Sequence, residues 1–134
     1  MQFIFEHIGL PAREPIAMKD WYVKTFGAEV VYEDGKSPPA FIVRLEGGVM
    51  VEIYQAYSSL NESGDNRLSG WRHVALRVES IESAKDHLEK RGVKFAGPIN
   101  AAGGGGRVLF FSDPEGNLLH LVERPFGSPL ATGK

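Results

Sequence analysis

Cysteine is absent from this chain of 134 residues. The protein therefore has no disulfide framework and no thiolate metal site, so any metal ion must be held by imidazole and carboxylate groups. No apolar run approaches the roughly 20 residues that a membrane-spanning helix needs. The first ten residues also lack the basic and then apolar pattern of a secretory signal. We expect a cytoplasmic protein that does not associate with membranes.

An excess of positive charge is lacking as well. The chain carries 15 lysines and arginines against 17 aspartates and glutamates, for a formal net charge of −2, and both signs are scattered along it. No basic patch is available for nucleic acid, so a small molecule is the expected partner. The length is that of one domain with a modest hydrophobic core.

The chain does contain an internal repeat. Two stretches begin alike, with FEHIGL and WRHVAL, and each continues into a helix-like segment that ends near a glycine, Gly27 or Gly92. Three strand-like segments follow in each half: AEVVYE, AFIVRLE and VMVEIYQ in the first, and VKFAGPI, RVLFFS and LLHLVE in the second. Each half is therefore predicted to have the element order β-α-β-β-β.

The repeat predicts the domain organisation. We expect a single domain, 1–134, made of two modules at about 1–57 and 71–124. The segment 58–70 is rich in Ser, Asn, Asp and Gly, which is typical of a connecting loop. The segment 125–134 is predicted to be a flexible tail.

Four polar residues stand at corresponding places in the two modules. Strand alternation puts His7, Glu52, His73 and His120 each on the face opposite an aliphatic row. Taken singly, each is better explained as a hydrogen-bonded or half-exposed side chain of a strand. Three histidines and one carboxylate at matching positions of a duplicated unit instead favour a metal site.

These features together resemble the vicinal oxygen chelate superfamily, which includes glyoxalase I, methylmalonyl-CoA epimerase, extradiol dioxygenases, fosfomycin resistance enzymes and bleomycin-binding proteins. The resemblance rests on the paired modules, FEHIGL, WRHVAL, VMVEIYQ and the hairpin SDPEGNLLHLVE. It implies an α+β glyoxalase-like fold in which the two modules form a curled mixed sheet around a cavity. It also implies a homodimer and one divalent ion, Zn, Ni, Mn or Fe(II), on His7, Glu52, His73 and His120.

One position departs from the pattern of the family. Glyoxalase-like members usually carry a glutamate in the last strand, where this chain has His120. The carboxylate that such members use to move a proton could then only be Glu52, which is the predicted catalytic residue. Pro11 stands where bacterial glyoxalases carry an arginine for glutathione, so the sequence does not predict that glutathione is used.

Three functions fit this pattern. The favoured one is a metal-dependent lyase or isomerase that acts on a small substrate with vicinal oxygens. A ring-cleaving dioxygenase of the extradiol type, with Fe(II) or Mn(II), is the enzyme alternative. The other alternative is a non-catalytic protein that binds or confers resistance to an antibiotic. The residues predicted to line the cavity are Phe5, Met50, Tyr54, Trp71 and Phe110, and each aromatic among them would also fit a core or an interface.

Overall fold

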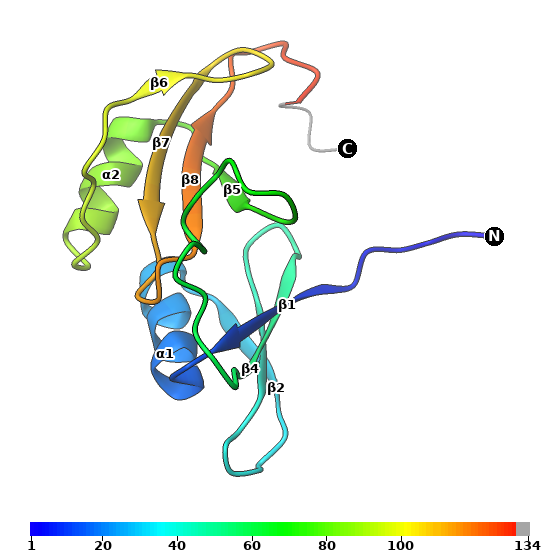
Figure 1. Ribbon diagram of the computed structural model, residues 1–134. Coiled ribbons are helices and arrows are strands. Elements are labelled where there is room, and N and C mark those ends of the chain that lie inside the picture. The colour runs from blue at the N-terminus through cyan, green and yellow to red at the C-terminus, as the bar shows by residue number, and fades with distance from the viewer. Residues whose placement is uncertain (131–134) are drawn as a thin grey trace. The chain divides into compact units, whose positions relative to one another are not determined.

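The computed structural model describes residues 1–130 and divides into two compact units, Met1–Leu60 and Asn61–Lys134. Each unit holds one helix and one four-stranded mixed sheet, in the order β-α-β-β-β (Figure 1). The predicted α+β fold with two such modules is therefore confirmed. No helix in the described part of the chain has the length and apolar character needed to cross a bilayer.

The first unit is built around a sheet with the strand order β1-β4-β3-β2. Strands β1 and β4 pair in parallel, while β4, β3 and β2 pair antiparallel. The helix α1 covers the apolar face of this sheet, where Val43, Val51 and Ile53 are buried. The elements are β1 (His7–Ala12), α1 (Pro15–Phe26), β2 (Glu29–Glu33), β3 (Phe41–Arg44) and β4 (Met50–Gln55).

Local sequence explains where α1 begins and ends. Pro15 occupies the start of the helix, where its missing N–H costs nothing and its fixed φ suits the first turn. Gly27 ends the helix in the left-handed conformation, with φ of 68°, and donates its N–H to the Val23 carbonyl. Met18 and Tyr22, one turn apart, are the buried anchors on the sheet side.

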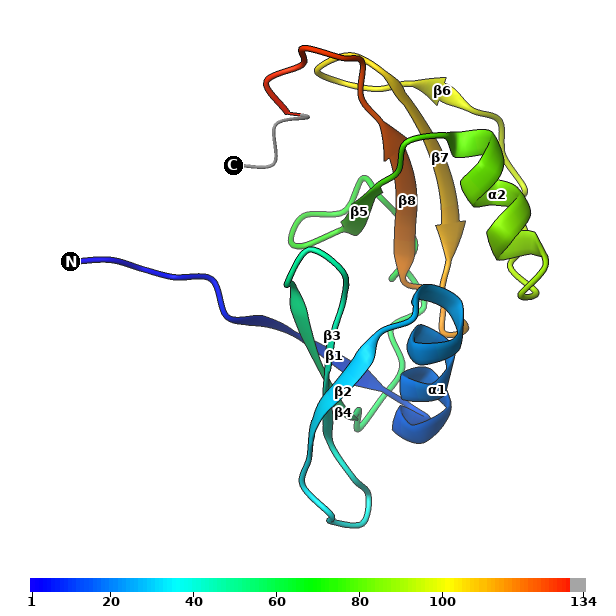
Figure 2. The same ribbon diagram turned by 180° about the vertical axis from the view of Figure 1, so that it is seen from behind.

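The second unit repeats this plan with the strand order β5-β8-β7-β6 (Figure 2). Strands β5 and β8 pair in parallel, and the remaining pairs are antiparallel. Its core joins Ile81 and Leu88 of the helix to Leu109, Leu119 and Leu121 of the sheet. The elements are β5 (His73–Arg77), α2 (Ile81–Glu89), β6 (Asn100–Ala101), β7 (Arg107–Ser112) and β8 (Leu118–Glu123).

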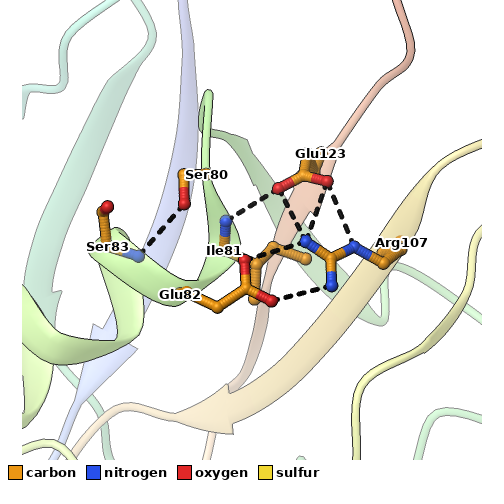
Figure 3. A network of polar contacts seen from close by, with 6 residues as sticks. All are labelled: Ser80, Ile81, Glu82, Ser83, Arg107 and Glu123. Carbon is orange, nitrogen blue, oxygen red and sulfur yellow. Dashed lines mark hydrogen bonds and ion pairs between the residues drawn. The ribbon is translucent and has the colours of Figure 1, made fainter.

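A polar network fastens the start of α2 to strands β7 and β8 (Figure 3). Glu123 accepts the first helical N–H, from Ile81, at 2.9 Å, and Ser80 caps the helix by accepting the Ser83 N–H. Arg107 then bridges Glu123 and Glu82 through both arms of its guanidinium. The hydrogen bonds from Arg107 lower the pKa of Glu82 to about 2. The helix N-terminus is thus held by side chains from two strands.

Both opening strands begin later than the sequence pattern predicts. Strand β1 begins at His7 and not at Phe5, and β5 begins at His73 and not at Trp71. The reason is the parallel partner: His7 pairs with Met50 and His73 with Leu118, so the residues two places earlier would face a glycine of a turn. Those glycines, Gly48 and Gly116 in the turns before β4 and β8, have positive φ and cannot continue a ladder.

The predicted strand at 93–99 is wrong. Only Asn100–Ala101 forms β6, and it pairs with the first residues of β7. Pro98 has no N–H to donate to a ladder and Gly97 weakens extended structure, so pairing stops short of them. Val93 is nevertheless buried, and it anchors the segment that follows α2. Of the predicted tail 125–134, residues 131–134 lie outside the described part of the chain.

Candidate functional site

In the first unit, His7 and Glu52 lie together on the sheet face opposite α1. The register of β1 and β4 places Gly9 beside Glu52, so His7, two residues earlier, shares that face and lies diagonally across from the carboxylate. His7 Nε2 is 3.5 Å from Glu52 Oε1, and both side chains are more than one third exposed. The sequence prediction that these two residues share a face is met within this unit.

In the second unit, His73 and His120 form the corresponding pair. Strand β5 places Ala75 beside His120, so His73 stands two residues before the paired position, as His7 does in the first unit. The two imidazole ring centroids are 4.9 Å apart. Phe110 pairs with His120 across β7 and β8, and its ring lies 4.7 Å from the His120 ring and 5.9 Å from the His73 ring.

The three imidazoles share one hydrogen-bonding pattern. Each ring uses Nδ1 toward an oxygen: Glu6 Oε1 at 2.8 Å for His7, Asn66 Oδ1 at 2.7 Å for His73, and the Leu121 carbonyl at 3.1 Å for His120. Carboxylate, amide and carbonyl oxygens only accept, so each of these contacts requires the hydrogen on Nδ1. This is the arrangement in which a histidine binds a metal through Nε2 while its other nitrogen is held from outside.

These donors fit a divalent cation, but the described residues contain no group of three or more such side chains placed to hold one. The donors come in pairs, one pair in each unit. Two ligands about 2.1 Å from one ion at a tetrahedral angle lie about 3.4 Å apart, and His7 Nε2 and Glu52 Oε1 are 3.5 Å apart. A set of imidazole nitrogens and one carboxylate oxygen suits Zn, Ni, Mn or Fe(II).

His120 is the buried member of the four, with a relative exposure of 6%. Burial lowers its pKa, the hydrogen bond to the Leu121 carbonyl opposes this effect, and electrostatic interactions with His73 and Arg124 lower it further. A neutral imidazole is the form that binds metal, so this environment keeps His120 ready to act as a ligand.

The lowered pKa of His120 predicts a pH dependence of stability. In the unfolded chain the residue binds a proton with a pKa near 6.5, more tightly than in the folded protein. Folding stability is then full above that pH and decreases as the pH falls through and below it. We expect metal-free protein to lose stability in urea between about pH 7.5 and about pH 5.5, and His120→Asn to lose less.

His87 provides the matched control for this measurement. It lies exposed on α2, and His87→Asn should leave the pH dependence of the parent unchanged. Equal pH dependence in the parent and in His120→Asn would show that burial of His120 does not control the acid sensitivity.

Three of the predicted cavity residues lie within strands and two precede strands. Tyr54 and Phe110 lie on the donor faces: the Tyr54 hydroxyl would be 3.3 Å from a Cβ placed on Gly9, and Phe110 contacts both imidazoles of its unit. Met50 is half-buried at the start of β4. Phe5 and Trp71 precede their strands and are 69% and 90% exposed. That these five residues line a cavity stays a prediction.

Two residues that contact the donors were not found from the sequence. The contact between Glu6 and His7 could not be predicted, because neighbouring residues of a strand ordinarily point to opposite faces of the sheet. Asn66 lies in the segment expected to be only a connecting loop, seven residues before His73. The reach of Asn66 depends on loop turns, which a strand-and-helix pattern does not reveal.

The chain resembles known proteins along nearly its whole length. The family model of the Glyoxalase/Bleomycin resistance protein/Dioxygenase superfamily matches residues 4–121. Biphenyl-2,3-diol 1,2-dioxygenase 2 of Rhodococcus globerulus is 29% identical over 93% of this chain, which spans 65% of that enzyme. An uncharacterised Escherichia coli protein, YaeR, is 26% identical over 88% of this chain and 94% of its own.

Solved structures show the same fold. A glyoxalase family protein from Enterococcus faecalis has a TM-score of 0.76 and 27% identity, over 90% of this chain and 97% of its own. The fosfomycin resistance protein FosX from Listeria monocytogenes, with Mn(II) and sulfate, has a TM-score of 0.72 and 20% identity over 97% of each chain. The antibiotic-binding protein TnmS3 from Streptomyces has a TM-score of 0.69 and 23% identity, over 93% of this chain and 99% of its own.

Proposed function

The chain belongs to the Glyoxalase/Bleomycin resistance protein/Dioxygenase superfamily, and from that premise we propose that it is a metal-dependent lyase or isomerase acting on a small substrate with vicinal oxygens. The proposed metal ligands are His7, Glu52, His73 and His120. Each unit supplies two of them, whether the two units that share an ion belong to one chain or to two chains of a homodimer.

The observation that carries this proposal is the common geometry of the two donor pairs. In both units a histidine of the first strand shares a face with a donor of the last strand, in the same strand register. In both units the Nδ1 atoms are occupied by oxygen acceptors and the Nε2 atoms are left for another partner. The fold alone requires neither the matched positions of the donors nor the shared use of Nδ1, because a histidine in a strand can carry its proton on either nitrogen.

A bound divalent ion would polarise two neighbouring oxygens of the substrate and stabilise the negative charge that develops on them. In this proposal Glu52 would take a proton from the substrate carbon beside those oxygens and return it to the adjacent carbon. Glu52 Oε1 lies 3.5 Å from His7 Nε2, and Glu6 Oε1 contacts His7 Nδ1 on the other side of the ring. A single carboxylate among three imidazoles predicts one acid–base residue and not two.

Ring cleavage of a catechol is the second candidate, and one comparison favours it. The relative that is 29% identical is named as a biphenyl-2,3-diol dioxygenase. Four protein donors leave fewer open positions for oxygen and a chelating catechol than the two histidines and one carboxylate typical of iron oxygenases. We therefore rank it below the lyase or isomerase.

Two assays separate these functions. Elemental analysis of protein purified without a histidine tag is expected to find a divalent metal, and proton exchange on small 2-hydroxycarbonyl compounds is expected without oxygen uptake. Oxygen consumption with catechols would instead establish the dioxygenase. Protein that is free of metal and ignores added Zn, Ni, Mn and Fe(II) would refute both and favour an antibiotic-binding role like that of TnmS3.

A further inference from the structure

The loop before β5 folds back onto the donor face of its own unit. Within it, Asp65 donates its N–H to the Glu62 carbonyl at 2.9 Å and accepts the Arg67 N–H on its side chain at 3.0 Å. A Cβ on Gly64 would lie 3.0 Å from the Gly116 carbonyl, so this part of the loop packs closely against the turn that leads into β8. The loop therefore has a defined conformation beside the turn that leads into β8.

These turns fix the backbone position of Asn66, which lies between Asp65 and Arg67. Asn66 points its side chain at β5, and its Oδ1 lies 2.7 Å from His73 Nδ1, the shortest of the three Nδ1 contacts. Arg72 reaches back from the residue beside His73 and donates to the Asp65 carbonyl at 3.4 Å. The loop backbone is thus tied at Asp65 to Arg72, the residue that directly precedes β5.

We propose that Asn66 is a positioning residue that sets the orientation and tautomer of His73 and so tunes the affinity of the site for its metal. The inference rests on the proposed metal-dependent function. Asn66 gives the exposed His73 ring its hydrogen bond, whereas the contacts of that ring with Phe110 and His120 are between ring systems and do not select a tautomer. Without Asn66 the ring can therefore carry its proton on either nitrogen.

The hydrogen-bond acceptors of the three imidazoles differ in how far they lie from the histidine in the sequence. His120 is oriented by the carbonyl of its own neighbour, Leu121, and His7 by the adjacent Glu6, so both partners come with the strand. His73 alone takes its acceptor from a residue seven positions away, in a loop. A change in this loop would therefore alter the metal site without touching a ligand.

Two variants at one position test the proposal. Asn66→Leu removes the acceptor and keeps a similar volume, whereas Asn66→Asp keeps an oxygen in place; Asn61→Leu, at an exposed position of the same loop, is the matched control. Long-range ¹⁵N–¹H NMR of the metal-free proteins reads the His73 tautomer directly, and calorimetric titration with Zn²⁺ reads affinity.

The proposal predicts that Asn66→Leu loses the single Nδ1–H tautomer of His73 and binds Zn²⁺ about 10- to 100-fold more weakly, while Asn66→Asp and Asn61→Leu keep both properties of the parent. Parental tautomer and affinity in Asn66→Leu would overturn it. A parent that binds no Zn²⁺ would refute the metal function and the effect on affinity together. The NMR measurement would still separately decide whether Asn66 orients His73.

Discussion

Replacing Glu52 with glutamine is expected to reduce turnover by about 10²- to 10⁴-fold, the range that a positioned acid–base residue contributes. Glu52 is the only carboxylate among the four proposed donors, and His120 stands where relatives of the glyoxalase kind carry a second one. Glutamine keeps the size of the side chain and an oxygen but cannot accept a proton. The assay is exchange of the carbon-bound proton of a 2-hydroxycarbonyl substrate with deuterated solvent, followed by NMR.

The measurement must separate loss of the base from loss of metal, because Glu52 is also a proposed ligand. Turnover is therefore compared at saturating metal, with bound metal measured in each sample. Glu46→Gln, which removes an exposed carboxylate in the turn before β4, is the matched control and should retain parental turnover. Full activity in a metal-loaded Glu52→Gln protein would show that another group moves the proton.

Gly106→Ala is expected to give the largest loss of stability of any single glycine substitution in this chain. A Cβ at this position would lie 1.8 Å from the Glu123 carbonyl oxygen, and φ is +102°, a conformation that L side chains rarely adopt. Both the collision and the strain involve backbone, which cannot rotate away as a side chain would. We expect a loss of more than about 4 kcal/mol in the free energy of unfolding, measured with urea.

Two neighbouring glycines are graded controls for Gly106. Gly105 has φ of +91° but only ordinary contact with Pro125, so Gly105→Ala should cost about 1 to 3 kcal/mol from backbone strain alone. Gly103 has no positive φ and nothing near its Cβ, so Gly103→Ala should change stability by less than about 0.5 kcal/mol. Three equal losses would contradict the assignment of a specific close approach at Gly106.

The architecture could be predicted from the sequence because the internal repeat indicates two modules and glycines indicate where helices end. Helix α1 ends directly before Gly27 as predicted, whereas α2 ends at Glu89, three residues before Gly92. The predicted order β-α-β-β-β is found in both units. The start of β1 and the extent of β6 could not be predicted from alternation alone. They depend on which partner residue is available, and a turn glycine or Pro98 ends the ladder even where the apolar pattern continues.

The donor pairs could also be predicted, since strand parity places His7 with Glu52 and His73 with His120. The partners that orient them could not. Glu6 and Asn66 contact the imidazoles through local turns whose geometry has no periodic signature. The burial of His120 likewise depends on the packing around β8. Strand alternation predicts which face a side chain is on, but not how deeply it is buried.

The most direct test of a single shared metal site is the stoichiometry of bound metal in three proteins: the parent, His7→Ala and His73→Ala. His7 and His73 belong to different donor pairs, so one ion held by both pairs predicts about one divalent ion per chain in the parent and loss of that same ion in either variant. No metal in the parent would contradict the account. So would a parent with two ions from which each variant removes only one, because that result would mean two separate sites.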